Sequence, residues 1–192
     1  MQKKILIVIA SIGGGGAERV AVQLANYFTQ NNLVVQICYW NANNNEYVVQ
    51  DSVILNHVSS GFRFFAVAKT IKEFKPDVLL SFTDVSNVVS YFAKLIANSN
   101  VFHVPTIHNN LKIRDSYLQL NVKTKLLRVL HKHVCNKSKR VVVVSEGAKK
   151  SLVDYYNLPD DKCVCIYNPV LNKVQFKGSK VQTQNATLKI VV

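Results

Sequence analysis

The chain has 192 residues, 48% of them hydrophobic, and a formal net charge of +13 at pH 7. This length suffices for one α/β domain with its own core, and the composition excludes a fibrous or largely disordered chain. The excess positive charge favours a partner of opposite sign, either nucleic acid or an anionic membrane surface. No run of about 18 apolar residues occurs, so we expect no membrane-spanning helix.

The first expected element is a strand that leads into a run of glycines. Ile5 to Ala10 is apolar and rich in β-branched residues, and Gly13 to Gly16 separate it from a helical pattern at 17–30. Consecutive glycines allow positive φ and the close approach of a ligand, and the helix start offers unpaired N–H groups to an anion. We therefore expect the turn to bind phosphates or sugar hydroxyls; the alternative is a turn that only docks the helix.

Strands and helices alternate through the rest of the chain. Further strands are expected at Val34–Tyr39, Val53–His57, Val78–Phe82, Phe102–Ile107, Val141–Val144 and Cys163–Tyr167, and further helices at 62–74, 84–97, 117–136 and 147–156. Most of these strands are continuous apolar runs, which is typical of a parallel sheet covered on both faces. The pattern predicts an α/β fold, a doubly wound and mostly parallel sheet with helices on both faces.

Ligands of such sheets bind beyond the carboxyl ends of the strands. His108 ends one strand there and is the candidate catalytic residue, because an imidazole in a polar cleft can hydrogen-bond a hydroxyl or a phosphate. The candidate substrate-binding residues are Gly14, Gly15, Gly16, Glu18, Thr83, Asn87, Asn109 and Ser145. The plainer alternatives are a turn histidine for His108 and a helix cap for Ser145.

The two commonest phosphate-binding glycine motifs do not fit this turn. Glu18 stands where the dinucleotide fingerprint has its third glycine, and no acidic residue ends the second strand at Tyr39-Trp40-Asn41. No Gly-Lys-Ser/Thr sequence follows the run, which argues against the loop of nucleoside triphosphatases. We expect neither a nicotinamide cofactor nor a metal, because no His or Cys set has ligand spacing.

The other histidines and the cysteines are interpreted as structural residues. We expect His57 and His103 to be packed within strands, and His131 and His133 to lie on the surface of a basic helix. The thiols expected to be buried in a reducing cytosol are those of Cys38, Cys135, Cys163 and Cys165.

Residues 112–140 form a basic segment, with nine lysines and arginines against one acidic residue. Helical spacing places Lys125, Arg128 and Lys132 on one face, and the opposite face is formed by Val122, Leu126, Val129 and Leu130. The basic face is either simply solvated or in contact with an anionic membrane, where each basic side chain contributes about 1 kcal/mol. The aromatic and basic stretch 62–65 suits such an interface. Nucleic acid fits the charge, but no nucleic-acid-binding motif is present.

Taken together, the motifs resemble the N-terminal domain of GT-B fold, retaining glycosyltransferases of family 4, especially bacterial members that build lipid-linked glycans, lipopolysaccharide or capsule. The features that carry the resemblance are Gly15-Gly16-Ala17-Glu18-Arg19 at a helix start, His108-Asn109 at a strand end, Val144-Ser145-Glu146 before a helix, and Tyr167-Asn168-Pro169-Val170.

The resemblance implies that residues 1–170 form a Rossmann-like acceptor-binding domain. Residues 171–192 would then be an interdomain linker and the first strand of a second domain that binds the nucleotide sugar. The paired glutamates and the diphosphate clamp of the family belong to that second domain and are missing from this chain. We therefore expect the chain alone to be inactive.

The resemblance also implies the roles of the site residues. The glycine turn would approach the donor diphosphate, and His108 would contact the donor sugar. Transfer from a nucleotide sugar to a lipid-linked or lipopolysaccharide-type acceptor would retain anomeric configuration, at the cytoplasmic face of a membrane. The alternative function is a non-catalytic basic module that binds an anionic membrane or a partner subunit.

Overall fold

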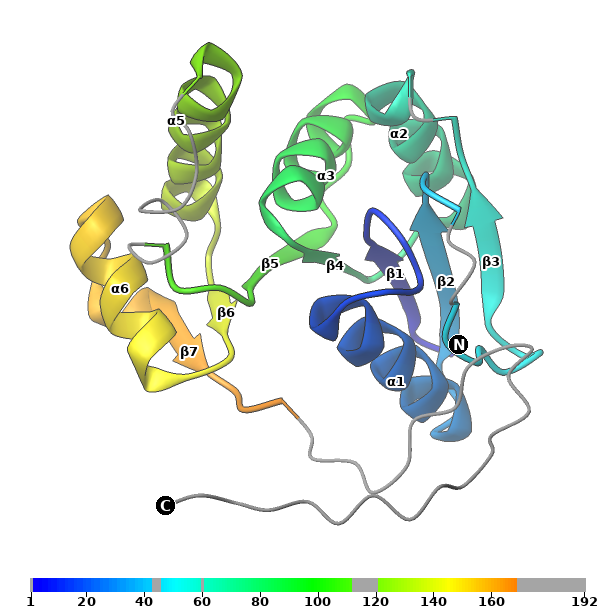
Figure 1. The fold of residues 1–192 in the computed structure, drawn as a ribbon. Helices are drawn as coiled ribbons and strands as arrows, with labels where there is room; N and C mark the ends of the chain where they lie inside the picture. Colours follow the sequence, from blue (N-terminus) through cyan, green and yellow to red (C-terminus); the bar gives the residue numbers. More distant parts are fainter. Residues whose placement is uncertain (1, 43–45, 60, 112–120, 169–192) are drawn as a thin grey trace, which may run out of the picture.

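A computed structural model describes residues 2–42, 46–59, 61–111 and 121–168. Their strands form one parallel sheet in the order β3-β2-β1-β4-β5-β6-β7 (Figure 1). The strands are β1 Lys4–Val8, β2 Val34–Tyr39, β3 Ile54–His57, β4 Val78–Phe82, β5 Phe102–Ile107, β6 Val141–Val143 and β7 Cys163–Cys165. The helices are α1 Gly16–Gln30, α2 Arg63–Phe74, α3 Asp84–Ile96, α5 Val122–Lys137 and α6 Glu146–Tyr156, with a short 3-10 turn at Asp160–Lys162.

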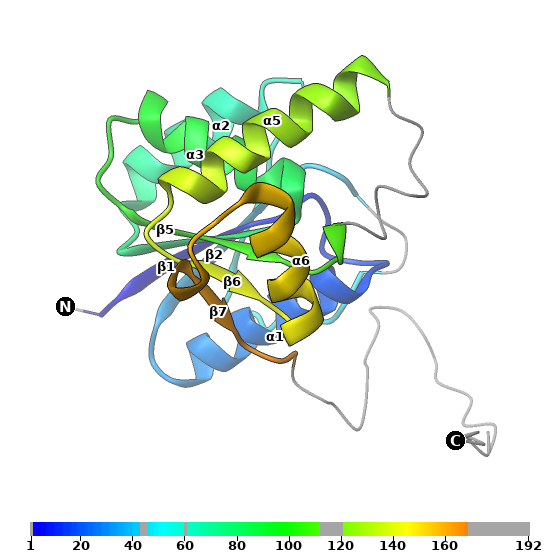
Figure 2. The ribbon, with the colours of Figure 1, turned by 90° about the vertical axis from the view of Figure 1, so that its left-hand side faces the viewer.

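The predicted fold class is confirmed. Helix α1 covers one face of the sheet, and α2, α3 and α5 cover the other (Figures 1 and 2). Helix α6 packs beside α5 on this second face, against Val141 and Val143 of β6. The boundaries of these elements differ from the predicted ones by a few residues, most at the start of α5. The predicted linker at 171–192 lies outside the described residues, as do Pro169 and Val170.

Strand β1 shows why the apolar runs make a sheet that is buried on both faces. Ile5 and Ile7 pack with α1, whereas Leu6 and Val8 pack on the opposite side with α2 and α3. Successive side chains of a strand alternate between the faces, so only a continuous apolar run satisfies both layers. Each such side chain contributes about 1.5–3 kcal/mol on burial.

The strand order places the site. Strand β1 lies between β2 and β4, so the chain winds in opposite directions on the two sides of β1. Such a switch point opens a crevice at the carboxyl ends of the strands. The first turns of α1 and α3 follow β1 and β4 at this edge, and β5 ends there at Ile107.

Helix α5 turns a different face to the core than the sequence predicts. His131, Val134 and Cys135 are buried on it, while Val122, Leu126 and Val129 are 82%, 57% and 65% exposed. The predicted surface position of His131 is therefore wrong, and Arg128 is half-buried rather than on a free basic face with Lys125 and Lys132, which are exposed. The reason is that both ring nitrogens of His131 find partners inside, on Asn87 and Tyr156.

The histidine predictions for the strands are half right. His103 is buried in β5, as expected. His57 is exposed, because β3 is an edge strand and its ring lies against Tyr39, with 5.0 Å between the ring centroids. The predicted burial of the thiols is confirmed for Cys38, Cys135 and Cys163, while Cys165 is half-buried.

Candidate functional site

The glycine turn has the conformation that the sequence suggests. Gly14 has φ of 93°, a region that side chains rarely enter, and Gly15 is the extended N-cap residue of α1. Gly16 has nothing within 4 Å of where a β-carbon would stand, and both Gly14 and Gly16 are exposed. The Tyr47 hydroxyl donates to the Gly15 carbonyl at 3.1 Å and fixes the turn from outside.

Glu18 folds back over the turn. A β-carbon placed on Gly15 would collide with Oε2 of Glu18, so this carboxylate lies at the N-terminal end of α1. A negative group is stabilised at this end of a helix by the exposed N–H groups and the helix dipole. The Glu18 carboxylate thus occupies the place where the N-terminal end of α1 would stabilise a bound phosphate most.

His108 follows β5 and is held at two sides. Its ring stacks on Phe82 with 5.2 Å between centroids, and its Nε2 lies 2.9 Å from the Thr106 hydroxyl. Burial lowers the pKa of His108 to about 4, so the imidazole is neutral at pH 7. Its Nδ1 is buried and has no hydrogen-bond partner among the described residues. A buried acceptor without a donor costs about 1–3 kcal/mol.

Thr83, between β4 and α3, has a strained backbone. Its φ of 76° and ψ of 158° lie in a region that β-branched residues almost never occupy, a cost of about 1–3 kcal/mol. Its hydroxyl is 3.4 Å from that of Ser86. Strain of this kind is found preferentially at functional sites, so the geometry keeps Thr83 among the candidates.

Ser145 and the two asparagines have separate positions. Ser145 is the N-cap of α6 and accepts a hydrogen bond from the Ala148 N–H at 3.1 Å, which satisfies the cap interpretation. Asn109 is exposed beside His108. Asn87 is fully buried, and its amide is enclosed by β4, β5 and α5 below the site, while its contact with substrate stays a prediction.

Asn87 is the centre of a buried polar network. Its Oδ1 accepts from the Ser81 hydroxyl at 2.6 Å, and its Nδ2 donates to the Thr106 carbonyl at 3.1 Å and lies 3.0 Å from Nε2 of His131. His103 meets the same Ser81 hydroxyl at 2.7 Å, and His131 meets Tyr156 at 3.1 Å. Sequence reasoning missed Ser81 and Thr106; the available signal was a hydroxyl in the last two residues of each of the two strands β4 and β5.

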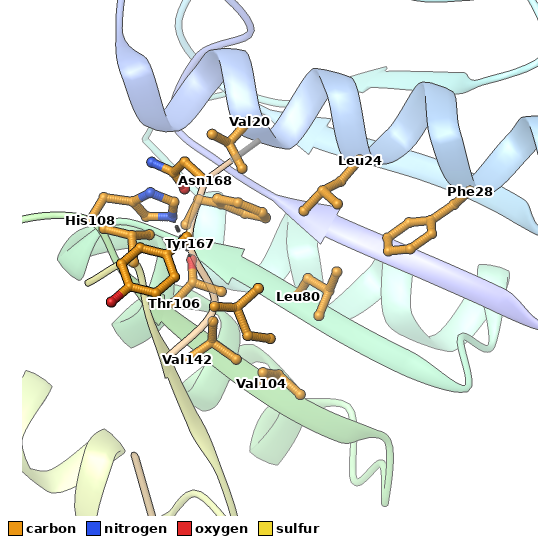
Figure 3. Close-up of a pocket in the computed structure, with 13 residues that line it drawn as sticks. Val20, Leu24, Phe28, Leu80, Val104, Thr106, His108, Val142, Tyr167 and Asn168 are labelled. Carbon is orange, nitrogen blue, oxygen red and sulfur yellow. Dashed lines mark hydrogen bonds between the residues drawn. The ribbon is translucent and has the colours of Figure 1, made fainter. Parts of the chain in front are cut away.

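Beside His108 lies an apolar groove of about 230 Å³ (Figure 3). Leu80, Val104 and Val142 form its floor on the sheet, and α1 contributes Val20, Leu24 and Phe28. Thr106, His108 and Asn168 bring polar groups to one end of the groove. The groove therefore joins the candidate site to a strip of sheet between α1 and the segment Ile166 to Asn168.

Within the described ranges, no three His, Cys, Asp or Glu side chains are grouped closely enough to hold a metal ion. None of the described helices is long and apolar enough to span a bilayer.

A parallel sheet with a switch point, a glycine turn opening α1 and polar strand ends around it define a Rossmann-like domain. The family model for Glycosyltransferase Family 4 matches residues 14–171. The chain belongs to this family.

A relative from Campylobacter jejuni is 33% identical over an alignment of 105 residues that covers 48% of this chain and 29% of the relative. It is named GalNAc-alpha-(1->4)-GalNAc-alpha-(1->3)-diNAcBac-PP-undecaprenol alpha-1,4-N-acetyl-D-galactosaminyltransferase. The chain thus spans under a third of the length of this relative.

Solved structures share the fold at low sequence identity. The lipopolysaccharide outer core galactosyltransferase WaaB has a TM-score of 0.62 at 13% identity, with 88% of this chain and 47% of WaaB covered. Anabaena HepE in complex with UDP-glucose has a TM-score of 0.64 at 18% identity, with 87% of this chain and 44% of HepE covered. Each likeness shows the fold, and this chain spans less than half of each of these proteins.

Proposed function

We propose that this chain is the acceptor-side half of a glycosyltransferase that moves a sugar from a nucleotide sugar to a lipid-linked or lipopolysaccharide-type acceptor. Residues 1–170 would be this half, and residues 171–192 would lead to a second domain that binds the nucleotide. Transfer would retain anomeric configuration without a metal cofactor, and the chain alone would be inactive. The observation that carries the proposal is the open glycine turn at the switch point, with His108 at the end of β5.

The geometry supports the roles of these residues. Gly16 leaves free space at the start of α1, where a diphosphate or sugar can approach the helix N–H groups. His108 presents a neutral ring at the end of an apolar groove and so suits a sugar hydroxyl. The relatives support the substrates, because the HepE structure holds UDP-glucose and the Campylobacter enzyme is named for an undecaprenyl-diphosphate-linked glycan.

The test is a transfer assay with radiolabelled UDP-glucose, UDP-GlcNAc and UDP-GalNAc as donors and undecaprenyl-diphosphate-linked saccharides as acceptors. Two proteins are assayed: residues 1–192 alone, and a longer protein in which residues 1–192 continue into the reading frame downstream of Val192. We expect transfer only in the longer protein, with the product anomer matching that of the donor. Absence of transfer there, or an inverted product, contradicts the proposal.

The chain would work as a peripheral protein on the cytoplasmic face of an anionic membrane, and α5 supplies the observation that favours this. Val122, Leu126 and Val129 form an exposed apolar stripe, flanked by the exposed lysines Lys123, Lys125, Lys132 and Lys137. Apolar side chains bordered by lysines are the pattern of helices that lie in a bilayer interface. Helix α2, at whose start Phe62 and Phe65 are 73% and 65% exposed, lies on the same face of the sheet as α5 (Figure 1).

Vesicle sedimentation tests this surface. We expect the chain to bind vesicles containing phosphatidylglycerol, and expect Leu126→Ser/Val129→Ser to weaken binding about tenfold, since two apolar side chains leave the interface. The matched control is Ile54→Ser/Leu55→Ser on the edge strand β3, which removes comparable exposed apolar groups elsewhere. Equal losses in both variants would contradict a role for α5. Tight vesicle binding by a longer protein that transfers no sugar would instead favour the non-catalytic membrane module.

A further inference from the structure

The proton positions around His108 follow from its neighbours. The Thr106 hydroxyl donates to the Ser81 carbonyl at 2.9 Å, and a carbonyl can only accept. A hydroxyl has one proton, so the contact of 2.9 Å between Thr106 Oγ1 and His108 Nε2 must run in the other direction. Nε2 therefore carries the proton and donates it to Thr106.

This assignment makes the other nitrogen an acceptor. A neutral imidazole has one N–H, so with the proton on Nε2 the lone pair is on Nδ1. Nδ1 is buried and finds no donor among the described residues. The ring lines the apolar groove, and Figure 3 shows the exposed side chain of Asn168 next to it, where an arriving ligand would displace the amide.

We infer that Thr106 is a positioning residue: it holds His108 with the proton on Nε2, so that Nδ1 accepts a hydrogen bond from a hydroxyl or N–H group of the bound sugar. The inference rests on the proposed function for the identity of the ligand, but the tautomer is a property of the free protein. A phosphate oxygen is an acceptor and finds no partner in Nδ1. The histidine therefore selects the sugar end of the donor over its diphosphate end.

The network below makes Thr106 rigid enough for this task. The Thr106 carbonyl accepts from Asn87 Nδ2 at 3.1 Å, and the Thr106 hydroxyl donates to the Ser81 carbonyl, so the backbone and the side chain of Thr106 are each held. Phe82 stacks on the other side of the His108 ring. Rotation of the imidazole would break the Thr106 bond and the stacking geometry together.

The first experiment is ¹⁵N NMR of the histidine rings in the free 192-residue chain, with His108→Gln to identify the His108 signals. We expect a protonated Nε2 and an unprotonated Nδ1 in the wild type and in Thr106→Ser, which keeps the hydroxyl. Thr106→Val should populate the other tautomer, and its melting temperature is measured to establish that it folds. A wild-type proton on Nδ1, or no change in a folded Thr106→Val, overturns the positioning role.

The second arm titrates the longer protein, which carries the nucleotide-binding domain of the proposed function, with UDP-glucose and, separately, with UDP. A shift of the Nδ1 resonance with UDP-glucose alone supports a contact from a sugar hydroxyl. An equal shift with UDP, or no shift with either compound, overturns that contact. Failure of the proposed function is seen separately, as absence of transfer in the longer protein, and leaves the tautomer measured in the free chain unaffected.

Discussion

At the residue scale, the glycines of the turn differ in what they contribute. Gly14 is required by its backbone, because its φ of 93° is strained for any side chain. Gly16 lies in the first turn of α1 with open space around it, so its lack of a side chain has no local structural reason. A conformational role and a ligand-binding role can therefore be separated by substitution.

Gly14→Ala is expected to lower the free energy of unfolding by more than about 1 kcal/mol, because alanine does not tolerate this φ. Gly16→Ala is expected to leave stability unchanged or to raise it by up to about 1 kcal/mol, because alanine favours the helix. Urea unfolding measures both values.

The Gly16 substitution also tests whether the donor binds at the glycine turn. In the longer protein, Gly16→Ala should reduce transfer at least tenfold despite its normal stability, because the methyl group stands where the donor approaches. Normal transfer by Gly16→Ala would remove the glycine turn from the site.

At the scale of elements, α5 shows where sequence reasoning reached its limit. Helical spacing predicted the helix itself, but the assumption that apolar residues face inward placed His131 outside and Val129 inside. The buried amide of Asn87, on a different helix, decides the orientation, because it provides His131 with a partner in the core. Such a contact depends on residues 44 positions apart and leaves no periodic signal.

The rest of the fold was predictable for a related reason. Strands such as Val141–Val143 are continuous apolar runs whose type and place do not depend on any single distant partner. At the site, the sequence predicted the position of His108, because it follows the end of a strand. The sequence could not predict the tautomer of His108, because the tautomer depends on the Ser81 carbonyl of the neighbouring strand.

His131→Leu is expected to lower the free energy of unfolding by about 2 kcal/mol, because the buried Asn87 amide and Tyr156 hydroxyl each lose a partner. Thermal and urea unfolding measure the change. The control is His133→Leu on the exposed side of the same helix, which is expected to change stability by less than about 0.5 kcal/mol. Similar losses in both variants would contradict the orientation of α5.

At the scale of the whole molecule, the buried histidines make the fold sensitive to acid. His103 is 5% exposed; burial, with the Lys94 charge adding to it, lowers its pKa to about 3. In the unfolded chain the same ring titrates near pH 6.5, at about its ordinary value. Below that pH the unfolded state binds a proton that the folded state does not, so acid favours unfolding.

We therefore expect stability to fall as the pH is lowered from about 6.5 towards 3, by about 1.4 kcal/mol per pH unit from His103 alone. His108, whose pKa is also lowered, acts in the same direction. Urea unfolding at pH 7, 6 and 5 gives the slope, and His103→Asn should reduce it even if that variant is less stable at neutral pH. A slope that is unchanged by the substitution would contradict a neutral, buried His103.

The carboxylate of Glu18 over Gly15 has a consequence for selectivity. A group tethered to the loop competes at an effective concentration of roughly millimolar or more, so free inorganic anions at cellular levels meet a counter-ion already in place. A ligand held only by its charge does not displace it. A ligand that binds both the glycine turn and the end of β5 has two points of attachment. Only such a ligand can displace the Glu18 carboxylate.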